Sequence, residues 1–215
     1  MTTRLAMRDY ILHKTRTGLG RSVGQPPTPV PPARIVVPES DLTQRLAAFT
    51  SALVKLAGQV HSAASAEDAC EYVAGVVAGR TAVASNAPFL AECGIPGIAG
   101  VRTGISNREE LRNLAASADV GITSADYALA DTGSLVMISS LEEARMVSLL
   151  PPVHIAVLPV TRLLTSLDEL FTLVPHPADL TSSMVLITGP SRTADIEQIL
   201  VRGVHGPGEI HVVLV

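Results

Sequence analysis

The sequence predicts an α/β protein with a mainly parallel sheet. Short apolar segments alternate with amphipathic helical segments along residues 39–215, as in sheets built from strand–helix units. The expected strands are continuous apolar runs, which indicates burial on both faces. The chain has 215 residues, of which 47% are hydrophobic, and a mean hydropathy of +0.36. A chain of this length can bury a large core without a metal ion or a disulfide.

Residues 1–38 are expected to lie outside this domain. Residues 4–20 predict a short helical arm. The segment Gly24–Pro38 reads GQPPTPVPPARIVVP, with six prolines in fifteen residues, which favours extended polyproline geometry. The chain therefore divides into an N-terminal helical arm with a Pro-rich linker or strap, residues 1–38, and an α/β domain, residues 39–215.

The first half of the domain is predicted to be rich in helices. Apolar residues recur at helical spacing from Leu42 to Leu56, after Ser40 and Asp41 as helix caps. Five further elements are expected up to residue 118, and Asn107 caps the last helix. They are a helix over 65–79, strands over 81–85 and 97–101 around a short helix over 88–93, and a helix over 107–118.

The second half is predicted to be rich in strands. Apolar runs indicate strands over 119–123, 134–139, 154–159, 184–189 and 209–215. Helices are expected between them over 166–174 and 194–201. In an open parallel sheet, ligands bind in the crevice beyond the carboxyl ends of the strands.

Composition excludes several classes of protein. A net charge of −4, 3% aromatic residues and no Trp disfavour a nucleic-acid-binding protein. The longest charge-free apolar stretch, Met146–Thr161, contains three prolines, so no membrane span is expected. The first residues lack the apolar core of a signal peptide, and a cytoplasmic location is expected. Two cysteines cannot hold an iron–sulfur cluster, and six scattered histidines predict no metal site.

The first polar segment that follows a predicted strand is GITSADYALADTGSLV, residues 121–136. Its carboxylates and hydroxyls can bind a polar ligand at one strand crossing. Asp126 is the first choice for an acid–base contact and Thr132 the second. The other candidate ligand-binding residues of this segment are Thr123, Ser124, Asp131, Gly133 and Ser134. Alternatively, Thr123 and Ser124 cap a helical turn that ends at Gly133.

Two further segments carry candidate ligand-binding residues. Gly189, Ser191, Arg192 and Thr193 precede a predicted helix whose first turn would bind a phosphate or carboxylate, unless Asp195 and Glu197 occupy that turn themselves. His205 and Gly206 lie in a Gly/Pro turn before the last strand, where a histidine suits proton transfer or is merely structural. Arg145 is either a carboxylate clamp or a solvated helix end.

Together these segments resemble the LUD-domain family. The resemblance rests on the runs at 121–134, 145–151 (RMVSLLP), 189–197 (GPSRTADIE) and 203–207 (GVHGP), in family order. It implies a three-layer α/β/α fold with a mainly parallel sheet, like that of the CoA-transferase and ribose-5-phosphate-isomerase group. It also implies a role in oxidising L-lactate to pyruvate beside two iron–sulfur partner proteins.

Two functional hypotheses follow from the residues and the resemblance. The first is a subunit of an L-lactate-oxidising assembly that binds substrate or cofactor in the crevice or organises its partners. The second is a stand-alone enzyme of the CoA-transferase or sugar-phosphate-isomerase type that binds a phosphorylated small molecule. No cofactor is detectable in the sequence, iron–sulfur clusters are expected on the partners, and whether an organic cofactor binds stays open.

Overall fold

The computed structural model describes residues 2–26, 37, 39–193 and 201–215. The chain divides into two compact units, Met1–Arg34 and Ile35–Val215. In the first unit, helix α1 (Thr2–Gly18) occupies the predicted arm, and its side chains Met7, Tyr10 and Ile11 are exposed. Most of the Pro-rich segment lies outside the described residues, and so does most of the helix predicted over 194–201.

The second unit is built on a wholly parallel six-stranded sheet, in the order β1-β12-β7-β4-β2-β3. Its strands are β1 (Gln59–Ser62), β2 (Ala82–Ala84), β3 (Val101–Arg102), β4 (Val120–Ser124), β7 (Val153–Leu158) and β12 (Glu209–Leu214). All six residues of β7 are buried, because layers cover both faces of the sheet.

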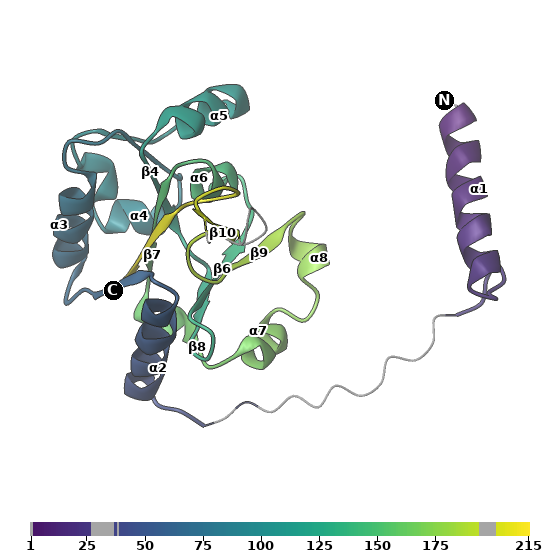
Figure 1. Cartoon of the computed structure of the whole chain (residues 1–215), viewed down its shortest axis with the longest axis horizontal. Coiled ribbons are helices and arrows are strands. Elements are labelled where there is room, and N and C mark those ends of the chain that lie inside the picture. The colour runs from purple at the N-terminus through teal and green to yellow at the C-terminus, as the bar shows by residue number, and fades with distance from the viewer. Residues whose placement is uncertain (1, 27–36, 38, 194–200) are drawn as a thin grey trace. The chain divides into compact units, whose positions relative to one another are not determined.

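Helices α3 (Ala66–Val77) and α4 (Pro88–Glu92) cover one face of this sheet (Figure 1). Their buried residues Val73 and Leu90 pack with Ile122 and Ile155 of the sheet. Ser65 caps α3, with the acidic Glu67 and Asp68 in the first turn as helix electrostatics favour.

The other face is covered by helix α2 (Leu42–Lys55) and by a second sheet with the strand order β8-β5-β6-β9. These strands are β5 (Tyr127–Leu129), β6 (Ser134–Ile138), β8 (Leu163–Leu164) and β9 (Met184–Ile187), and only the β5–β8 pair is parallel. Phe49 and Leu53 of α2 and Leu135 of β6 pack against Ala156 and Leu158 of β7. The prediction of a buried strand over 184–189 was wrong in this respect, because β9 has no buried residue.

Shorter elements complete the unit. They are η1 (Ile95–Gly97), α5 (Arg108–Ser117), α6 (Met146–Leu149), η2 (Val160–Arg162), α7 (Leu167–Leu173), α8 (Pro177–Leu180) and the hairpin of β10 (Arg192–Thr193) and β11 (Val201–Arg202).

The strand predicted over 97–101 was wrong. Its glycines form the η1 turn and a loop in which Gly100 adopts a positive φ of 89°, and β3 begins only at Val101.

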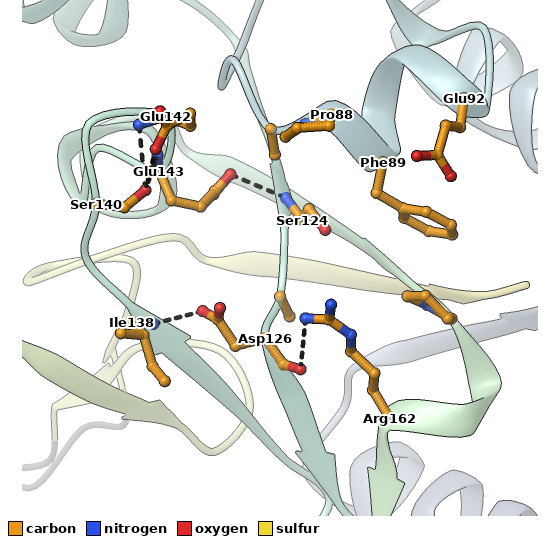
Figure 2. Close-up of a pocket in the computed structure, with 13 residues that line it drawn as sticks. Pro88, Phe89, Glu92, Ser124, Asp126, Ile138, Ser140, Glu142, Glu143 and Arg162 are labelled. Carbon is orange, nitrogen blue, oxygen red and sulfur yellow. Dashed lines mark hydrogen bonds between the residues drawn. The ribbon is translucent and has the colours of Figure 1, made fainter. Parts of the chain in front are cut away.

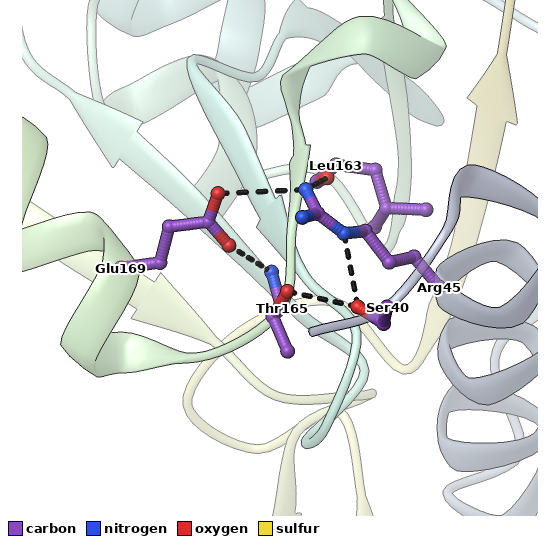
Figure 3. Close-up of polar contacts among 5 residues, drawn as sticks. All are labelled: Ser40, Arg45, Leu163, Thr165 and Glu169. Carbon is purple, nitrogen blue, oxygen red and sulfur yellow. Dashed lines mark hydrogen bonds and ion pairs between the residues drawn. The ribbon is translucent and has the colours of Figure 1, made fainter. Parts of the chain in front are cut away.

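A polar network fixes the start of α2 (Figure 3). Arg45 Nη1 donates to the Leu163 carbonyl at 3.2 Å and lies 3.4 Å from Glu169 Oε1, and Arg45 Nε donates to Ser40 Oγ at 3.1 Å. Glu169 Oε2 accepts a hydrogen bond from the Thr165 amide at 2.6 Å. The network therefore links α2 to β8 and α7.

Replacing Arg45 with methionine is expected to lower the free energy of unfolding by about 1 to 3 kcal/mol. The thioether side chain keeps the apolar stem but leaves the Leu163 carbonyl and one Glu169 oxygen without this donor. Urea denaturation measures the loss. The control is Lys55→Met at the exposed end of the same helix, which should change stability by no more than about 0.5 kcal/mol. Equal losses in the two variants would contradict the role of the network.

Candidate functional site

A pocket of about 580 Å³ opens beyond the carboxyl end of β4, at the edge where the sequence places ligand binding (Figure 2). Ser124 ends β4, and Asp126 lies in the short link between β4 and β5. Glu143 comes from the loop between β6 and α6, Arg162 from η2, and Glu92 from the end of α4. Four separate segments of the chain therefore place polar side chains around one space.

Glu143 is the most buried acidic group of this pocket, with 7% of its surface exposed. Its Oε1 accepts hydrogen bonds from the Ser85 hydroxyl and from the Ser124 amide, the latter at 3.0 Å. Its Oε2 is buried and has no hydrogen-bond partner in the described residues. Burial raises the pKa of Glu143 from 4.5 to about 8, so the side chain is a neutral acid at pH 7.

The loop that carries Glu143 is held by hydrogen bonds to its backbone. Ser140 Oγ accepts hydrogen bonds from the amides of Glu142 and Glu143, at 3.1 and 3.0 Å. The Asn86 amide donates to the Glu142 carbonyl at 2.9 Å. These bonds position the Glu143 carboxyl beside the end of β4.

Asp126 and Arg162 form the second polar part of the pocket. Asp126 Oδ2 accepts the Ile138 amide at 2.6 Å, and Arg162 Nη1 donates to the Asp126 carbonyl at 3.3 Å. Burial raises the pKa of Asp126, while the Ile138 amide and the Arg162 charge oppose that rise. The exposed Arg162 guanidinium lies 6.0 Å from the centre of the Tyr127 ring.

The charges restrict the ligands that this pocket can take. Among the described residues that line it, Arg162 is the only cation, and it faces the carboxylates of Asp126, Glu92 and Glu142 and the neutral Glu143. A doubly charged phosphate would meet an excess of negative charge there. A small monocarboxylate is better matched, because one guanidinium can bind one carboxylate in a two-pronged arrangement. The remaining acids then face the rest of the ligand.

Of the residues predicted in the first polar segment, Ser124 and Asp126 line the pocket and Thr123 does not. Thr123 and Ser124 lie within β4, so neither caps a helical turn. Thr123 is 1% exposed, and its hydroxyl lies 2.8 Å from His154 Nε2 inside the core. Burial lowers the pKa of His154 from 6.5 to about 4, so this histidine is a neutral core residue.

The expectation that the whole segment meets at one strand crossing was wrong. Strand β5, which the sequence analysis missed, carries the chain away from Asp126, and Asp131, Thr132 and Gly133 form the turn at the far end of the β5–β6 hairpin. The Asp131 amide donates to the Thr165 carbonyl at 3.1 Å. Ser134 Oγ contacts the hydroxyls of Thr132 and Thr188, at 2.8 and 2.7 Å.

The predicted anion site at residues 189–193 does not have the expected geometry. Arg192 and Thr193 form strand β10, paired with β11, so no helix begins at Thr193. The Arg192 guanidinium donates to the carbonyl of Leu56, at the end of α2. Gly189 has φ 78° and passes so close to α2 that an added Cβ would lie 2.8 Å from Leu56 Cβ.

The third predicted segment joins the second, on the opposite edge of the sheet from the pocket. The Ser191 amide donates to the Pro207 carbonyl at 2.8 Å. A Cβ added at Gly206 would lie 3.7 Å from Ser191 Cβ, so the two segments are in contact. The turn precedes β12, whose first residue pairs with Val153 at the start of the parallel β7. His205 is exposed and lies at the amino edge, so it does not reach the carboxyl-edge crevice.

Sequence reasoning missed Glu143, Ser85 and Arg162. In the sequence, Glu143 belongs to the polar run SSLEEAR, which is typical of a solvated loop. One signal was available, because this run directly follows the predicted strand 134–139, and strand ends are where such folds place sites. Arg145, which the sequence singled out, is exposed and lies 3.5 Å from Ser183 Oγ, without lining the pocket.

Within the described ranges, no three His, Cys, Asp or Glu side chains are grouped so as to hold a metal ion. None of the helices in those ranges is long and apolar enough to cross a membrane.

The sequence is similar to curated proteins that share one name. The chain is 44% identical over 103 residues to "Lactate utilization protein C" of Halalkalibacterium halodurans, a match that covers 46% of this chain and 45% of the relative. It is 40% identical over 111 residues to the protein of the same name from Bacillus subtilis, covering 50% and 46%. The matched part spans about half the length of these curated relatives.

Among solved structures, the fold is similar to a DUF162 family protein from Deinococcus radiodurans. The TM-score is 0.64 at 17% identity, over 82% of this chain and 99% of that one. This likeness confirms the predicted three-layer α/β fold. The model of the LUD domain matches residues 46–215, which include every residue of the parallel sheet and all the pocket-lining residues described above. The chain belongs to the LUD domain family.

Proposed function

We propose that this chain is a subunit of a multi-protein system that oxidises L-lactate to pyruvate, and that it binds the substrate in the carboxyl-edge pocket. The shared name of its relatives supports a role in lactate use. The observation that carries the assignment to this pocket is its charge pattern, in which one cation, Arg162, stands among hydrogen-bonding acids. A 2-hydroxy acid presents one carboxylate and one neighbouring oxygen, which this pattern fits.

Oxidation of lactate to pyruvate releases two electrons and two protons, so the system needs an electron acceptor. The two cysteines of this chain, Cys70 on α3 and Cys93 after α4, cannot ligate an iron–sulfur cluster by themselves. Iron–sulfur clusters on two partner proteins would accept the electrons. This chain's own part is to hold the carboxylate through Arg162 and to face the reacting oxygen with Asp126 and Glu143.

The test is lactate-dependent reduction of an artificial electron acceptor under anaerobic conditions, with the two iron–sulfur partners present. Reduction should require this chain. Asp126→Asn should lower the rate at least tenfold, whereas Thr132→Val, at the far end of the β5–β6 hairpin, should leave it within about twofold. Equal reduction without the chain, with active partners, would refute the proposal. Equal rates in both variants would show that the substrate does not bind in this pocket.

A stand-alone enzyme acting on a phosphorylated small molecule is the weaker alternative. Its expected phosphate site at Ser191–Thr193 is a hairpin strand, and the pocket carries more acidic than basic side chains. This alternative requires tight binding of a sugar phosphate or a CoA ester. A calorimetric screen of such ligands that shows no binding would exclude it.

A further inference from the structure

Glu143 has an unusual hydrogen-bond inventory for a buried acid. One oxygen, Oε1, is occupied by two donors, the Ser85 hydroxyl and the Ser124 amide. The other, Oε2, is buried without a partner in the described residues. A buried polar atom without a partner costs free energy, and because the Glu143 side chain lines the pocket, a ligand bound there can supply the partner.

The chemistry of that missing partner follows from where the proton lies. The Ser124 amide can only donate, and with Ser85 donating as well, Oε1 serves as the acceptor of the carboxyl group. The proton of the neutral acid then resides on Oε2, which becomes a donor without an acceptor. The group that completes the site is therefore an oxygen with free lone pairs.

We propose that Glu143 donates a hydrogen bond from Oε2 to the 2-oxo oxygen of a small 2-oxo acid whose carboxylate binds Arg162, and that this pair of contacts selects the ligand class. Pyruvate is the smallest such ligand with a side chain. The ligand class rests on the proposed function, in which pyruvate is the product, whereas the donor role of Glu143 rests on its hydrogen bonds together with its burial, which keeps the carboxyl group neutral at pH 7.

The other charged groups around the pocket agree with this arrangement. Asp126, Glu142 and Glu92 line it as carboxylates, and Arg162 is its cation. Asp126 is among the causes that raise the pKa of Glu143, after the dominant effect of burial. A neutral Glu143 spares the ligand carboxylate a fourth negative neighbour, so protonation and ligand binding favour each other.

The experiment is calorimetric titration of the full chain with pyruvate between pH 6 and pH 9.5, without partner proteins. The affinity should be constant below about pH 7.5 and fall about tenfold per pH unit once the pH exceeds the pKa of about 8. Propionate has the same length and carboxylate but lacks the 2-oxo oxygen. It should bind at least tenfold more weakly at pH 6.5.

Glu143→Gln tests the donor directly. The carboxamide keeps an acceptor at the Oε1 position and a donor at the Oε2 position but does not titrate, so pyruvate affinity should become independent of pH. Glu71→Gln, at an exposed position of α3 outside the pocket, should retain the wild-type profile. A Glu143→Gln profile that falls like the wild type, or a propionate affinity equal to that of pyruvate, would overturn the proposal, provided circular dichroism shows the variants folded.

Failure of this inference and failure of the proposed function give different results. If the wild type binds no pyruvate at pH 6.5 but lactate-dependent reduction still requires the chain, the ligand assignment of Glu143 is wrong and the proposed function stands. If pyruvate binds with the expected pH profile but reduction proceeds without the chain, the inference stands and the subunit role falls.

Discussion

Replacing Gly121 with alanine is expected to destabilise the fold by about 3 kcal/mol or more. A Cβ at this position would lie 1.9 Å from the carbonyl oxygen of Val147 and 2.9 Å from Pro151 Cγ. The nearest atom belongs to the backbone of α6, which packs directly on β4, so no side-chain rotation relieves the contact. Either α6 moves away from the sheet or β4 shifts from its neighbours.

Urea denaturation followed by circular dichroism measures this loss. Gly75→Ala is the matched control, because Gly75 lies within helix α3 and an added Cβ meets nothing within 4 Å. That variant should gain about 0.5 to 1 kcal/mol, since alanine favours a helix over glycine. If both variants unfolded at the wild-type urea concentration, the close approach of α6 to β4 would be wrong.

The second large effect concerns pH and the Glu143→Gln variant. In the unfolded chain Glu143 ionises near pH 4.5, but in the folded chain burial holds its pKa at about 8. Between these values the unfolded state has lost a proton that the folded state retains, so wild-type stability is fully present below pH 4.5 and falls as the pH rises towards 8. Glutamine does not titrate. The stability of Glu143→Gln relative to wild type should therefore rise from pH 5 to pH 8, by on the order of 4 kcal/mol.

The readout is the free energy of unfolding of both proteins at several pH values. His154 contributes an opposite trend, since its depressed pKa of about 4 costs stability as the pH falls below 6.5, but both proteins share it and it cancels in the difference. Glu142→Gln serves as the exposed control and should run parallel to wild type. Parallel curves for Glu143→Gln and wild type would show that Glu143 ionises normally.

The sequence predicted best those elements whose pattern arises from local burial. The apolar runs of β4, β7 and β12 and the helical spacing in α2 each reflect contacts with a covering layer. Even the cap of α2 was predicted, and Asp41 accepts the Gln44 amide there. The edge strand β1 was missed because its sequence, QVHS, is mostly polar and half-exposed.

The sequence predicted only those residues of the candidate site that lie at or directly after the end of a predicted strand. Ser124 and Asp126 end or follow a strand, and the rule about carboxyl ends located them. Glu143 and Arg162 come to the pocket from other segments, through packing that no local pattern encodes. His205 was misplaced for a similar reason, because the turn before a parallel strand lies at the amino edge whatever its composition.

The link between β4 and β5 places Asp126 at the junction of two sheets. β4 belongs to the parallel sheet and β5 to the second one, and only Ala125 and Asp126 separate them. Glu143 is tied to the parallel sheet through the Ser124 amide, and Asp126 to the second sheet through the Ile138 amide. The distance between the two acids therefore depends on the relative position of the two sheets. Core substitutions between the sheets, at Met137 or Ala156, are therefore expected to change the distance between the two acids without altering any pocket side chain.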